Sequence, residues 1–297
     1  MPTVVILGGS GQMGIALSRI PWATRLPVRE PAHVVTLEHQ RFDITRDDHR
    51  RSLLDDRKPS VVINAAAYTN VEGAEDEPDL CREVNVRAPA ELARLCAERG
   101  CRFVHLSTDY VFDGDQRTPY TEDDPTGGLS VYGRSKAEGD AAVLGADGSP
   151  LVVRSSWLFG EGRNFVRTIL RLAGERDRLQ VVADQVGCPT RAEDFADAVA
   201  RLLAIGAQGL YHFSNDGACS WFDFALEAVR LANLPTTIEP VPAASMTSFK
   251  APRPHYSVLD CSKYIAATGH RPRHWKAALR DYLDADPENR NAASIGA

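Results

Sequence analysis

Apolar, β-branched runs alternate with longer stretches of helical periodicity along the first half of the chain. Parallel strands that are covered on both faces read as continuous apolar runs. Their alternation with helical patterns predicts a parallel sheet with helices on both sides. Strands are expected at Thr3–Leu7, Val34–Leu37, Val61–Ile63, Phe103–Leu106 and Leu151–Arg154, and helices from Gln12, near Asp47–Asp56, from about Asp79 to Arg99 and near Ser130–Leu144.

The pattern changes after residue 155. The stretch Glu239–Tyr256 is rich in Pro, Ala and Ser and is expected to be a loop, and the tail after Pro287 to be frayed. We expect a larger domain over residues 1–153, to which about 190–215 return, and a smaller domain over 154–297. In this second part helices are expected at Asn164–Leu172, Ala192–Ile205, Trp221–Leu231 and Trp275–Leu283, and strands at Leu179–Val182 and Gly209–Phe213.

Composition narrows the class of protein. The chain has 297 residues, 43% of them hydrophobic, and a net charge of -6. A net negative charge does not attract nucleic acid or an anionic membrane, so we expect neither as a partner. The six cysteines show no C-x-x-C spacing and read as reduced thiols, and the histidines show no metal-ligand spacing. We see neither a signal peptide nor an apolar run of membrane-spanning length, and expect a cytoplasmic protein.

Three closely spaced glycines, Gly8, Gly11 and Gly14, directly follow the first strand, and a helix begins at Gln12. Such glycines allow a tight turn and let the backbone approach a pyrophosphate at the positive end of the helix. We therefore expect an α/β fold with a Rossmann-type, doubly wound parallel sheet that binds a dinucleotide. A turn that binds no ligand is the alternative.

Two further places belong to the expected cofactor site. Glu38 ends the second strand, about where an acidic residue holds the adenosine ribose hydroxyls, and it would disfavour a 2′-phosphate and so favour NADH. Asp43 is a second acidic candidate. Small residues in Asn64-Ala-Ala-Ala-Tyr68 would let a flat ring or a ribose approach the end of the third strand. The alternatives are a surface glutamate and tight helix–sheet packing.

The most specific element is Tyr132-Gly-Arg-Ser-Lys136, because a spacing of four puts Tyr132 and Lys136 on one face of a helix. An ammonium beside a phenol lowers the pKa of the phenol towards neutrality, as a proton donor to a carbonyl oxygen requires. Thr108 follows the fourth strand and can orient the same carbonyl oxygen. Asp109 can bond a sugar hydroxyl or a nearby backbone N–H. An exposed surface pair is the alternative for Tyr132 and Lys136.

These motifs resemble the dTDP-4-dehydrorhamnose reductases, a family of the extended short-chain dehydrogenase/reductases. The resemblance runs in order through nearly the whole chain. It is carried by the glycine loop with Gln12, by Asn64–Glu72, Leu106–Gly114, Tyr132–Lys136, Arg154–Gly160, Asn164–Val166 and Asp184–Thr190, and by Arg253-Pro-x-x-Ser257.

The resemblance implies reduction of C4 of a dTDP-4-keto-6-deoxyhexose, dTDP-4-dehydro-L-rhamnose to dTDP-L-rhamnose, by NADPH or NADH. It implies that Tyr132 donates the proton and that Lys136 is its partner and a ribose ligand, with the second domain mainly binding substrate. A sugar nucleotide also needs guanidinium partners, for which Arg253 is the candidate. The expected catalytic residues are Tyr132, Lys136 and Thr108, the expected cofactor contacts Gly8, Gly11, Gln12, Met13, Gly14, Glu38, Asp43, Ile44, Ala66, Ala67, Tyr68, Tyr132 and Lys136, and the expected substrate contacts Thr108, Asp109, Trp157 and Arg253.

One departure and two alternatives stay open. The resemblance implies that some members of the family are dimers bridged by a metal ion, which glutamates bind. One of these glutamates lies on the first helix, where this chain has Ala16. We therefore expect no metal, although a homodimer without one stays open. The substrate could be a different dTDP-4-keto-6-deoxysugar, for example in dihydrostreptose formation. The chain could also resemble a non-catalytic NADP-binding regulatory subunit of a methionine adenosyltransferase.

Overall fold

A six-stranded, all-parallel sheet forms the centre of the computed structural model, which describes residues 3–25, 33–246 and 249–285. The strand order is β2-β1-β3-β4-β5-β10, so the chain reverses direction across the sheet between β1 and β3. This arrangement confirms the expected Rossmann-type fold, and the reversal is the place where such sheets bind ligands. The strands are β1 (Thr3–Leu7), β2 (His33–Leu37), β3 (Val61–Asn64), β4 (Arg102–Thr108), β5 (Leu151–Ser155) and β10 (Gly209–His212).

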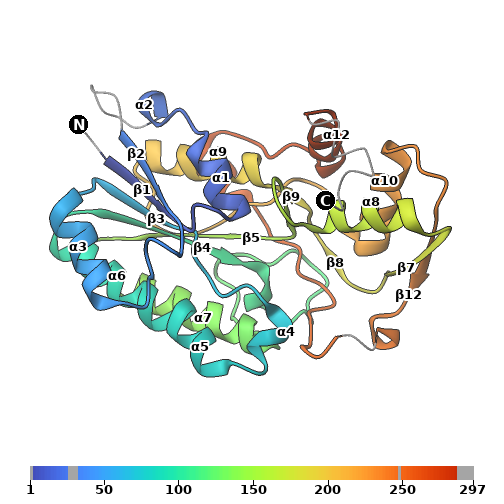
Figure 1. The fold of residues 1–297 in the computed structure, drawn as a ribbon, viewed down its shortest axis with the longest axis horizontal. Helices are drawn as coiled ribbons and strands as arrows, with labels where there is room; N and C mark the ends of the chain where they lie inside the picture. Colours follow the sequence, from blue (N-terminus) through green and yellow to red (C-terminus); the bar gives the residue numbers. More distant parts are fainter. Residues whose placement is uncertain (1–2, 26–32, 247–248, 286–297) are drawn as a thin grey trace.

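Helices cover both faces of this sheet (Figure 1). Successive side chains of a strand point to opposite faces. In β1, Val4 and Ile6 therefore pack into one core beneath α1 and α9, whereas Val5 and Leu7 pack into the core on the other side. The helices on the first side are α1 (Gln12–Ser18) and α9 (Ala192–Ala204), and those on the second are α3 (Asp47–Arg57), α6 (Ala88–Glu98) and α7 (Val131–Leu144).

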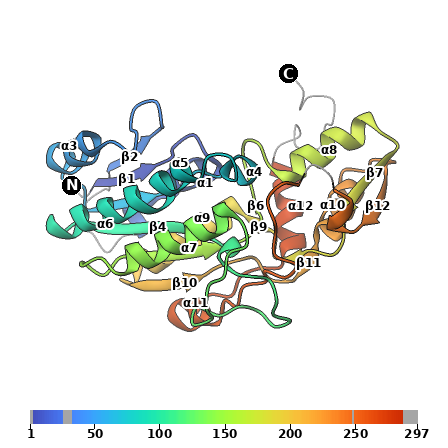
Figure 2. The ribbon, with the colours of Figure 1, turned by 90° about the horizontal axis from the view of Figure 1, so that it is seen from below.

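A second group of elements lies beyond the carboxyl ends of the strands (Figure 2). It has its own apolar core, in which Phe224, Trp275 and Leu279 are buried. The chain crosses back, because β10 pairs with β5 and α9 packs against α1. The division at residue 153 stays a prediction. The group contains α8 (Phe165–Glu175), β7 (Arg178–Val182), α10 (Trp221–Leu231), β12 (Thr237–Val241) and α12 (Trp275–Ala285).

One expectation about local structure was wrong. The stretch 239–256 is not all loop, because its first three residues belong to β12, which pairs in parallel with β7, and a 3₁₀ turn, η3 (Ala243–Ser245), follows. The helix expected over 79–99 runs without a break from Pro78 to Glu98, as α5 (Pro78–Arg82), a π-helical turn η1 (Glu83–Arg87) and α6. π-Helical turns are frequent at functional sites. Here the turn carries the buried Asn85, whose side chain bonds both the N–H and the C=O of Tyr68.

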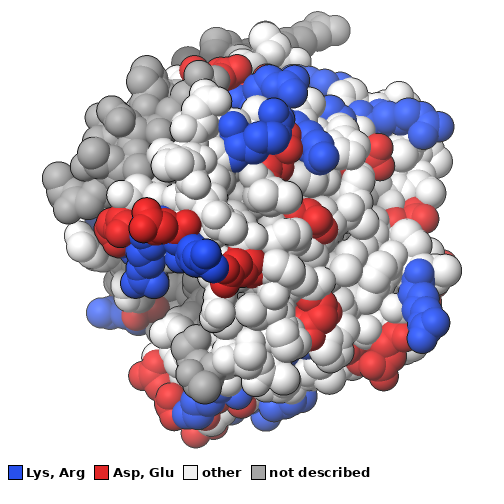
Figure 3. All heavy atoms as spheres, turned by 90° about the vertical axis from the view of Figure 1, so that its right-hand side faces the viewer, with Lys and Arg blue, Asp and Glu red and all other residues white. Residues whose placement is uncertain are grey.

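The tail after Pro287 lies outside the described residues. Charges of both signs are interspersed on the face formed by the second group of elements (Figure 3). Over the described ranges, we find no helix with the length and apolarity needed to cross a bilayer.

Several short elements were not expected from the sequence. They are α2 (Trp22–Arg25), α4 (Val71–Ala74), η2 (Asp109–Val111), β6 (Leu158–Phe159), β8 (Val186–Gly187), β9 (Thr190–Arg191), β11 (Cys219–Ser220) and α11 (Ser262–Thr268).

Candidate active site

The glycine loop forms a tight cradle between the ends of β1 and β3. Gly8 has a φ of +78°, and a Cβ there would lie 2.8 Å from the carbonyl carbon of Ala65. A Cβ on Gly14 would lie 2.2 Å from the carbonyl oxygen of Gly8, so neither position admits a side chain. Gly11 is the N-cap of α1 and has no side chain that could cap the first amides of the helix. The cradle therefore fits the pyrophosphate of a dinucleotide.

Gln12 joins this cradle to the second group of elements. Its Nε2 donates to the carbonyl oxygen of Arg163 at 3.2 Å, while its Oε1 is buried and has no donor among the described residues. Met13 is buried in the core below the loop. A buried acceptor without a donor, next to amides that lack a cap, is consistent with a ligand that completes this corner.

The remaining expected cofactor residues line the same edge of the sheet. Glu38 is exposed directly after β2, and Ala66 and Ala67 are half-buried after β3. Asp43 bonds locally, since its Oδ1 accepts the backbone N–H of Thr45 at 2.9 Å. Their contacts with a cofactor stay predictions. The other two of this group are Ile44, which is buried, and Tyr68, whose hydroxyl donates to Glu77 at 2.6 Å.

Tyr132, Thr108 and Asp109 are brought together at the carboxyl end of β4. Tyr132 lies in the first turn of α7, where the side chain of Ser130 caps the helix. Its hydroxyl is hydrogen-bonded to the side chain of Thr108, and this bond acts to lower the pKa of Tyr132. The Thr108 hydroxyl also lies 3.0 Å from Oδ1 of Asp109, so its single proton can be donated to either neighbour. Thr108 therefore links Tyr132 to Asp109.

Lys136 is on the same face of α7 as Tyr132, but its side-chain nitrogen is directed elsewhere. Nζ donates to the carbonyl oxygen of Leu106 at 2.8 Å and lies 3.0 Å from Nε2 of His105. The expectation that Lys136 lowers the pKa of Tyr132 is wrong for this arrangement. Burial raises the pKa of Tyr132, which the hydrogen bond to Thr108 only partly offsets. Burial also lowers the pKa of Lys136 to about 8.

Asp109 is buried and holds the end of β4 in place. Its Oδ2 accepts a hydrogen bond from Ser257 at 2.5 Å, and its Oδ1 accepts one from Thr108. Burial raises the pKa of Asp109 to about 7, although both hydroxyl donors favour the carboxylate. Both oxygens are therefore engaged by protein hydroxyls, and a contact of Asp109 with the sugar stays a prediction.

Trp157 stands at the entrance to the second group of elements with a strained backbone. Its φ is +46°, which is rare for a bulky side chain and is often found at binding sites. Its indole stacks on that of Trp221, with centroids 3.5 Å apart and planes at 6°. Gly187 leaves room for the same ring, because a Cβ there would lie 2.5 Å from Cε2 of Trp157. The indole is thus clamped, with 9% of Trp157 exposed.

The guanidinium of Arg253 already interacts with several protein groups. It pairs with Glu72 of α4, stacks on the ring of Phe249 with 3.9 Å to the centroid, and bonds the side chain of Tyr110. Glu72 in turn accepts the backbone N–H of Ala251 at 2.8 Å. Arg253 therefore straps the C-terminal loop onto the helix after β3, and a guanidinium with five N–H donors keeps some for a ligand.

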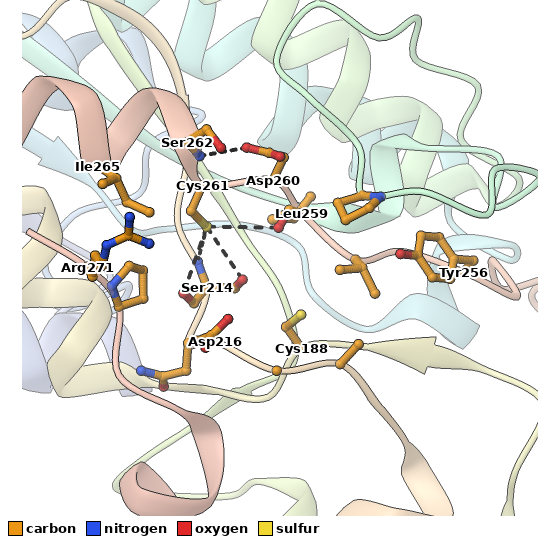
Figure 4. Close-up of a pocket in the computed structure, with 16 residues that line it drawn as sticks. Cys188, Ser214, Asp216, Tyr256, Leu259, Asp260, Cys261, Ser262, Ile265 and Arg271 are labelled. Carbon is orange, nitrogen blue, oxygen red and sulfur yellow. Dashed lines mark hydrogen bonds between the residues drawn. The ribbon is translucent and has the colours of Figure 1, made fainter.

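A cavity of about 410 Å³ lies behind this site (Figure 4). Tyr256 and Val258 line the cavity, whereas Ser257 between them bonds Asp109. Figure 4 shows the Cys261 thiol bonded to Ser214 there, and the lining includes neither Tyr132 nor Lys136.

No metal cluster is found within the ranges that the structure describes, where three or more His, Cys, Asp or Glu side chains do not converge. Ala16 is buried in α1 against the core. Glu193, the nearby acidic residue on α9, pairs with Arg191 at 3.0 Å.

Sequence reasoning missed several residues of this site. Ser257 and Glu72 stand inside the motifs that carried the resemblance, so their polar side chains were a usable signal. His105 is a polar residue in the middle of the apolar run Phe103–Leu106, and that interruption was the other available signal. Nothing in the sequence indicated that Trp221 would stack on Trp157. Two buried hydroxyls at the same edge, Ser107 and Ser155, have no partner among the described residues.

The chain is similar over nearly its whole length to a family model and to known relatives. The family model described as "RmlD substrate binding domain" matches residues 2–287. The dTDP-4-dehydrorhamnose reductase of Aggregatibacter actinomycetemcomitans is 39% identical over 293 residues, covering 95% of this chain and 98% of that protein. A probable dTDP-4,6-dihydroxy-2-methyloxan-3-one 4-ketoreductase of Streptomyces antibioticus is 41% identical over 303 residues, covering 97% and 99%.

A solved structure is similar over the same extent. The dTDP-4-dehydrorhamnose reductase of Bacillus anthracis in complex with NADP superposes with a TM-score of 0.88 at 32% sequence identity. The match covers 96% of this chain and 99% of that one, so it includes both the sheet and the second group of elements.

Proposed function

The chain belongs to the family of the RmlD substrate binding domain model, the dTDP-4-dehydrorhamnose reductases, and from this premise we propose that it reduces the C4 keto group of dTDP-4-dehydro-L-rhamnose to give dTDP-L-rhamnose. The observation that carries the proposal is the contact of Thr108 with both Tyr132 and Asp109, next to a glycine cradle that fits a dinucleotide.

The chemistry divides between cofactor and protein. Bound NADPH or NADH supplies the hydride to C4 of the sugar. The Tyr132 hydroxyl gives its proton to the oxygen that gains charge, and Thr108, already bonded to Tyr132, orients that oxygen. Lys136 lies four residues, about one helical turn, after Tyr132 on α7 and stabilises the phenolate that forms. Its Nζ must leave His105 to do so.

The second group of elements would hold the sugar nucleotide. The clamped indole of Trp157 offers a rigid apolar edge beside the end of β5. Arg253, with donors beyond those given to Glu72, would bond the diphosphate. Closing the site between the sheet and these elements excludes water from the reacting carbonyl.

Glu38 bears on the choice of cofactor. It is exposed at the end of β2, and a carboxylate there disfavours the 2′-phosphate of NADPH. We therefore propose that NADH is accepted. The relative from Bacillus anthracis was solved with NADP, so the comparison with NADPH is the informative one.

A second candidate keeps the reaction and changes the sugar. The relative from Streptomyces antibioticus, named as a probable 4-ketoreductase of another dTDP sugar, is as similar to this chain as the rhamnose enzyme. The residues that would distinguish the sugars lie in the second group of elements.

One assay tests these proposals. The purified chain is given dTDP-4-dehydro-L-rhamnose with NADPH or with NADH, the oxidation of the cofactor is followed, and the product is identified by NMR. We expect turnover and dTDP-L-rhamnose. Turnover only with a different dTDP-4-keto-6-deoxysugar would select the second candidate. Tight binding of NADP(H) without turnover of either sugar would contradict both and favour a regulatory, non-catalytic protein.

A further inference from the structure

A buried row of polar side chains, unused by the proposed reaction, leads from the sheet to Lys136. Asn64 and His105 are directly paired in the register of β3 and β4, and both are fully buried. Asn64 Nδ2 lies 3.1 Å from His105 Nδ1, and His105 Nε2 lies 3.0 Å from Lys136 Nζ. The imidazole therefore touches Asn64 with one nitrogen and Lys136 with the other.

Asn64 decides which ring nitrogen carries the proton. Its Oδ1 accepts the backbone N–H of Ala66 at 3.1 Å. Rotating the side-chain amide by half a turn would place its NH₂ group against that N–H, so the orientation of the amide is fixed. The NH₂ group therefore faces Nδ1 of His105, which must accept. Burial holds the pKa of His105 well below its usual value, so the ring is neutral and its single proton is on Nε2.

The N–H of Nε2 then points at the Lys136 nitrogen. A hydrogen bond between the two requires a lone pair on Nζ, which only the neutral amine has. Lys136 as an amine can still donate to the carbonyl oxygen of Leu106. An ammonium at this place would set one donor against another at 3.0 Å.

The Asp140 carboxylate raises the pKa of Lys136, but this effect is smaller than the lowering by burial. Asp140, four residues further along α7, is paired with Arg154 of β5 at 2.8 Å, so the buried carboxylate already has its counter-charge. Its other oxygen has no hydrogen-bond partner among the described residues and lies 4.0 Å from His105 Nε2. The remaining titratable neighbour is the thiol of Cys81 on α5, which burial keeps protonated by raising its pKa.

We propose that Asn64 and His105 are positioning residues that hold Lys136 on β4 as a neutral amine, and that Lys136 takes up a proton from solvent when the cofactor binds. The inference rests on the proposed function for the identity of the cofactor. The added proton makes Nζ an ammonium, which the Nε2–H of His105 repels. The ammonium then turns from β4 towards the cofactor ribose and Tyr132. Lys136 thus becomes charged only when there is a phenolate to stabilise.

The first test needs no cofactor and no turnover. In protein labelled with ¹⁵N at histidine, long-range ¹H–¹⁵N correlation distinguishes a ring protonated at Nε2 from one protonated at Nδ1, and a His105→Gln variant assigns the signal. We expect the Nε2–H form for His105. A proton on Nδ1 overturns the proposal, whatever the enzyme reduces.

The second test measures protons during binding. Titration calorimetry of NADPH and NADH at pH 9, above the pKa of about 8 that burial gives Lys136, in buffers of different ionisation enthalpy is expected to show uptake of nearly one proton per site, because the group changes its pKa on binding. Binding with no net proton uptake at pH 9 overturns the proposal. If protons are taken up but neither sugar is reduced, the proposed function fails and this inference stands.

Asn64→Asp is the matched variant, since it changes one atom. The new carboxylate would accept both the N–H of Ala66 and Nδ1–H of His105, which moves the ring proton away from Lys136. We expect the Nδ1–H form and loss of the proton uptake. Asn64→Asp with unchanged uptake contradicts the proposal. If this variant does not fold, His105→Gln serves instead, because its Oε1 accepts from an ammonium and should also abolish the uptake.

His212→Gln is the control for a merely structural effect. His212 is the other fully buried histidine of this sheet, bonded to the carbonyl oxygen of Tyr120 at 3.1 Å and to Arg154, with no contact to Lys136. We expect its uptake to equal that of the wild type. Equal loss of uptake in His212→Gln and Asn64→Asp would show that any buried polar change suffices, and would overturn the assignment.

Discussion

Ser257 donates a hydrogen bond to the buried carboxylate of Asp109, and this contact ties the C-terminal segment to the end of β4 across 148 residues of sequence. Asp109 passes the constraint on, because its other oxygen holds Thr108, which holds Tyr132. The position of the proposed proton donor therefore depends on a contact between the two parts of the chain.

Asp109 should make stability depend on pH. Its pKa of about 7 in the folded chain is above the ordinary 3.8, so the folded state binds the proton more tightly than the unfolded state. This contribution is complete below about pH 4 and is lost as pH rises towards 7, by about 1.4 kcal/mol per pH unit at most. Urea unfolding of wild type and Asp109→Asn at pH 5 and 7.5 measures it. The variant should gain stability relative to wild type as pH rises, and parallel pH dependence of the two would contradict the prediction.

Tyr132→Phe and a pair of Thr108 variants separate the proton donor from its orienting group. Tyr132→Phe should fold and bind cofactor yet lose most turnover, since only the hydroxyl is removed. Thr108→Val should lower kcat by about 10²-fold, the usual scale for one oriented donor. Thr108→Ser keeps the hydroxyl and should stay within several-fold of wild type. Steady-state kinetics with the keto sugar measures all three, and a Tyr132→Phe rate near wild type would remove Tyr132 from its role.

The sheet could be predicted from the sequence because its strands are buried on both faces, as in Val61–Ile63. The strand β12 could not, because Thr237-Ile-Glu-Pro-Val241 contains a proline and buries only Ile238. It forms because β7 offers an edge, which is a property of the folded chain.

The site divides in the same way. Tyr132, Lys136 and Thr108 follow from helical spacing and from the end of a strand. The partner of Lys136 does not, because it depends on the register that places Asn64 beside His105. Likewise the pairing of Arg253 with Glu72 joins residues 181 apart, so only the assembled fold shows that this guanidinium is already engaged.

Glu72→Gln should loosen the strap over the site. Gln keeps an acceptor for the backbone N–H groups of Lys250 and Ala251 but gives up the charge that pairs with Arg253. We expect KM for the sugar nucleotide to rise several-fold, with kcat changed less. Asp76→Asn is the control, because Asp76 pairs with Lys250 while 66% exposed, and such pairs contribute little. Equal effects of the two variants, or a lower KM in Glu72→Gln, would contradict the prediction.

Gly187→Ala tests whether the tight packing of the Trp157 indole, which also stacks on Trp221, matters for substrate binding. The new Cβ would lie 2.5 Å from Cε2 of Trp157, so the indole must shift off Trp221 or strain the backbone that already has a φ of +46°. Overpacking of this kind costs about 1–3 kcal/mol. We expect lower unfolding stability, a changed near-ultraviolet circular dichroism signal from the stacked indoles, and a higher KM for the sugar nucleotide with the affinity for NAD(P)H unchanged. Gly145→Ala, an exposed position where the nearest atom is 3.3 Å away, supplies the control for adding a methyl group. A KM for the sugar that stays at the wild-type value, while the indole signal changes, would show that Trp157 packs the second core without contacting the substrate.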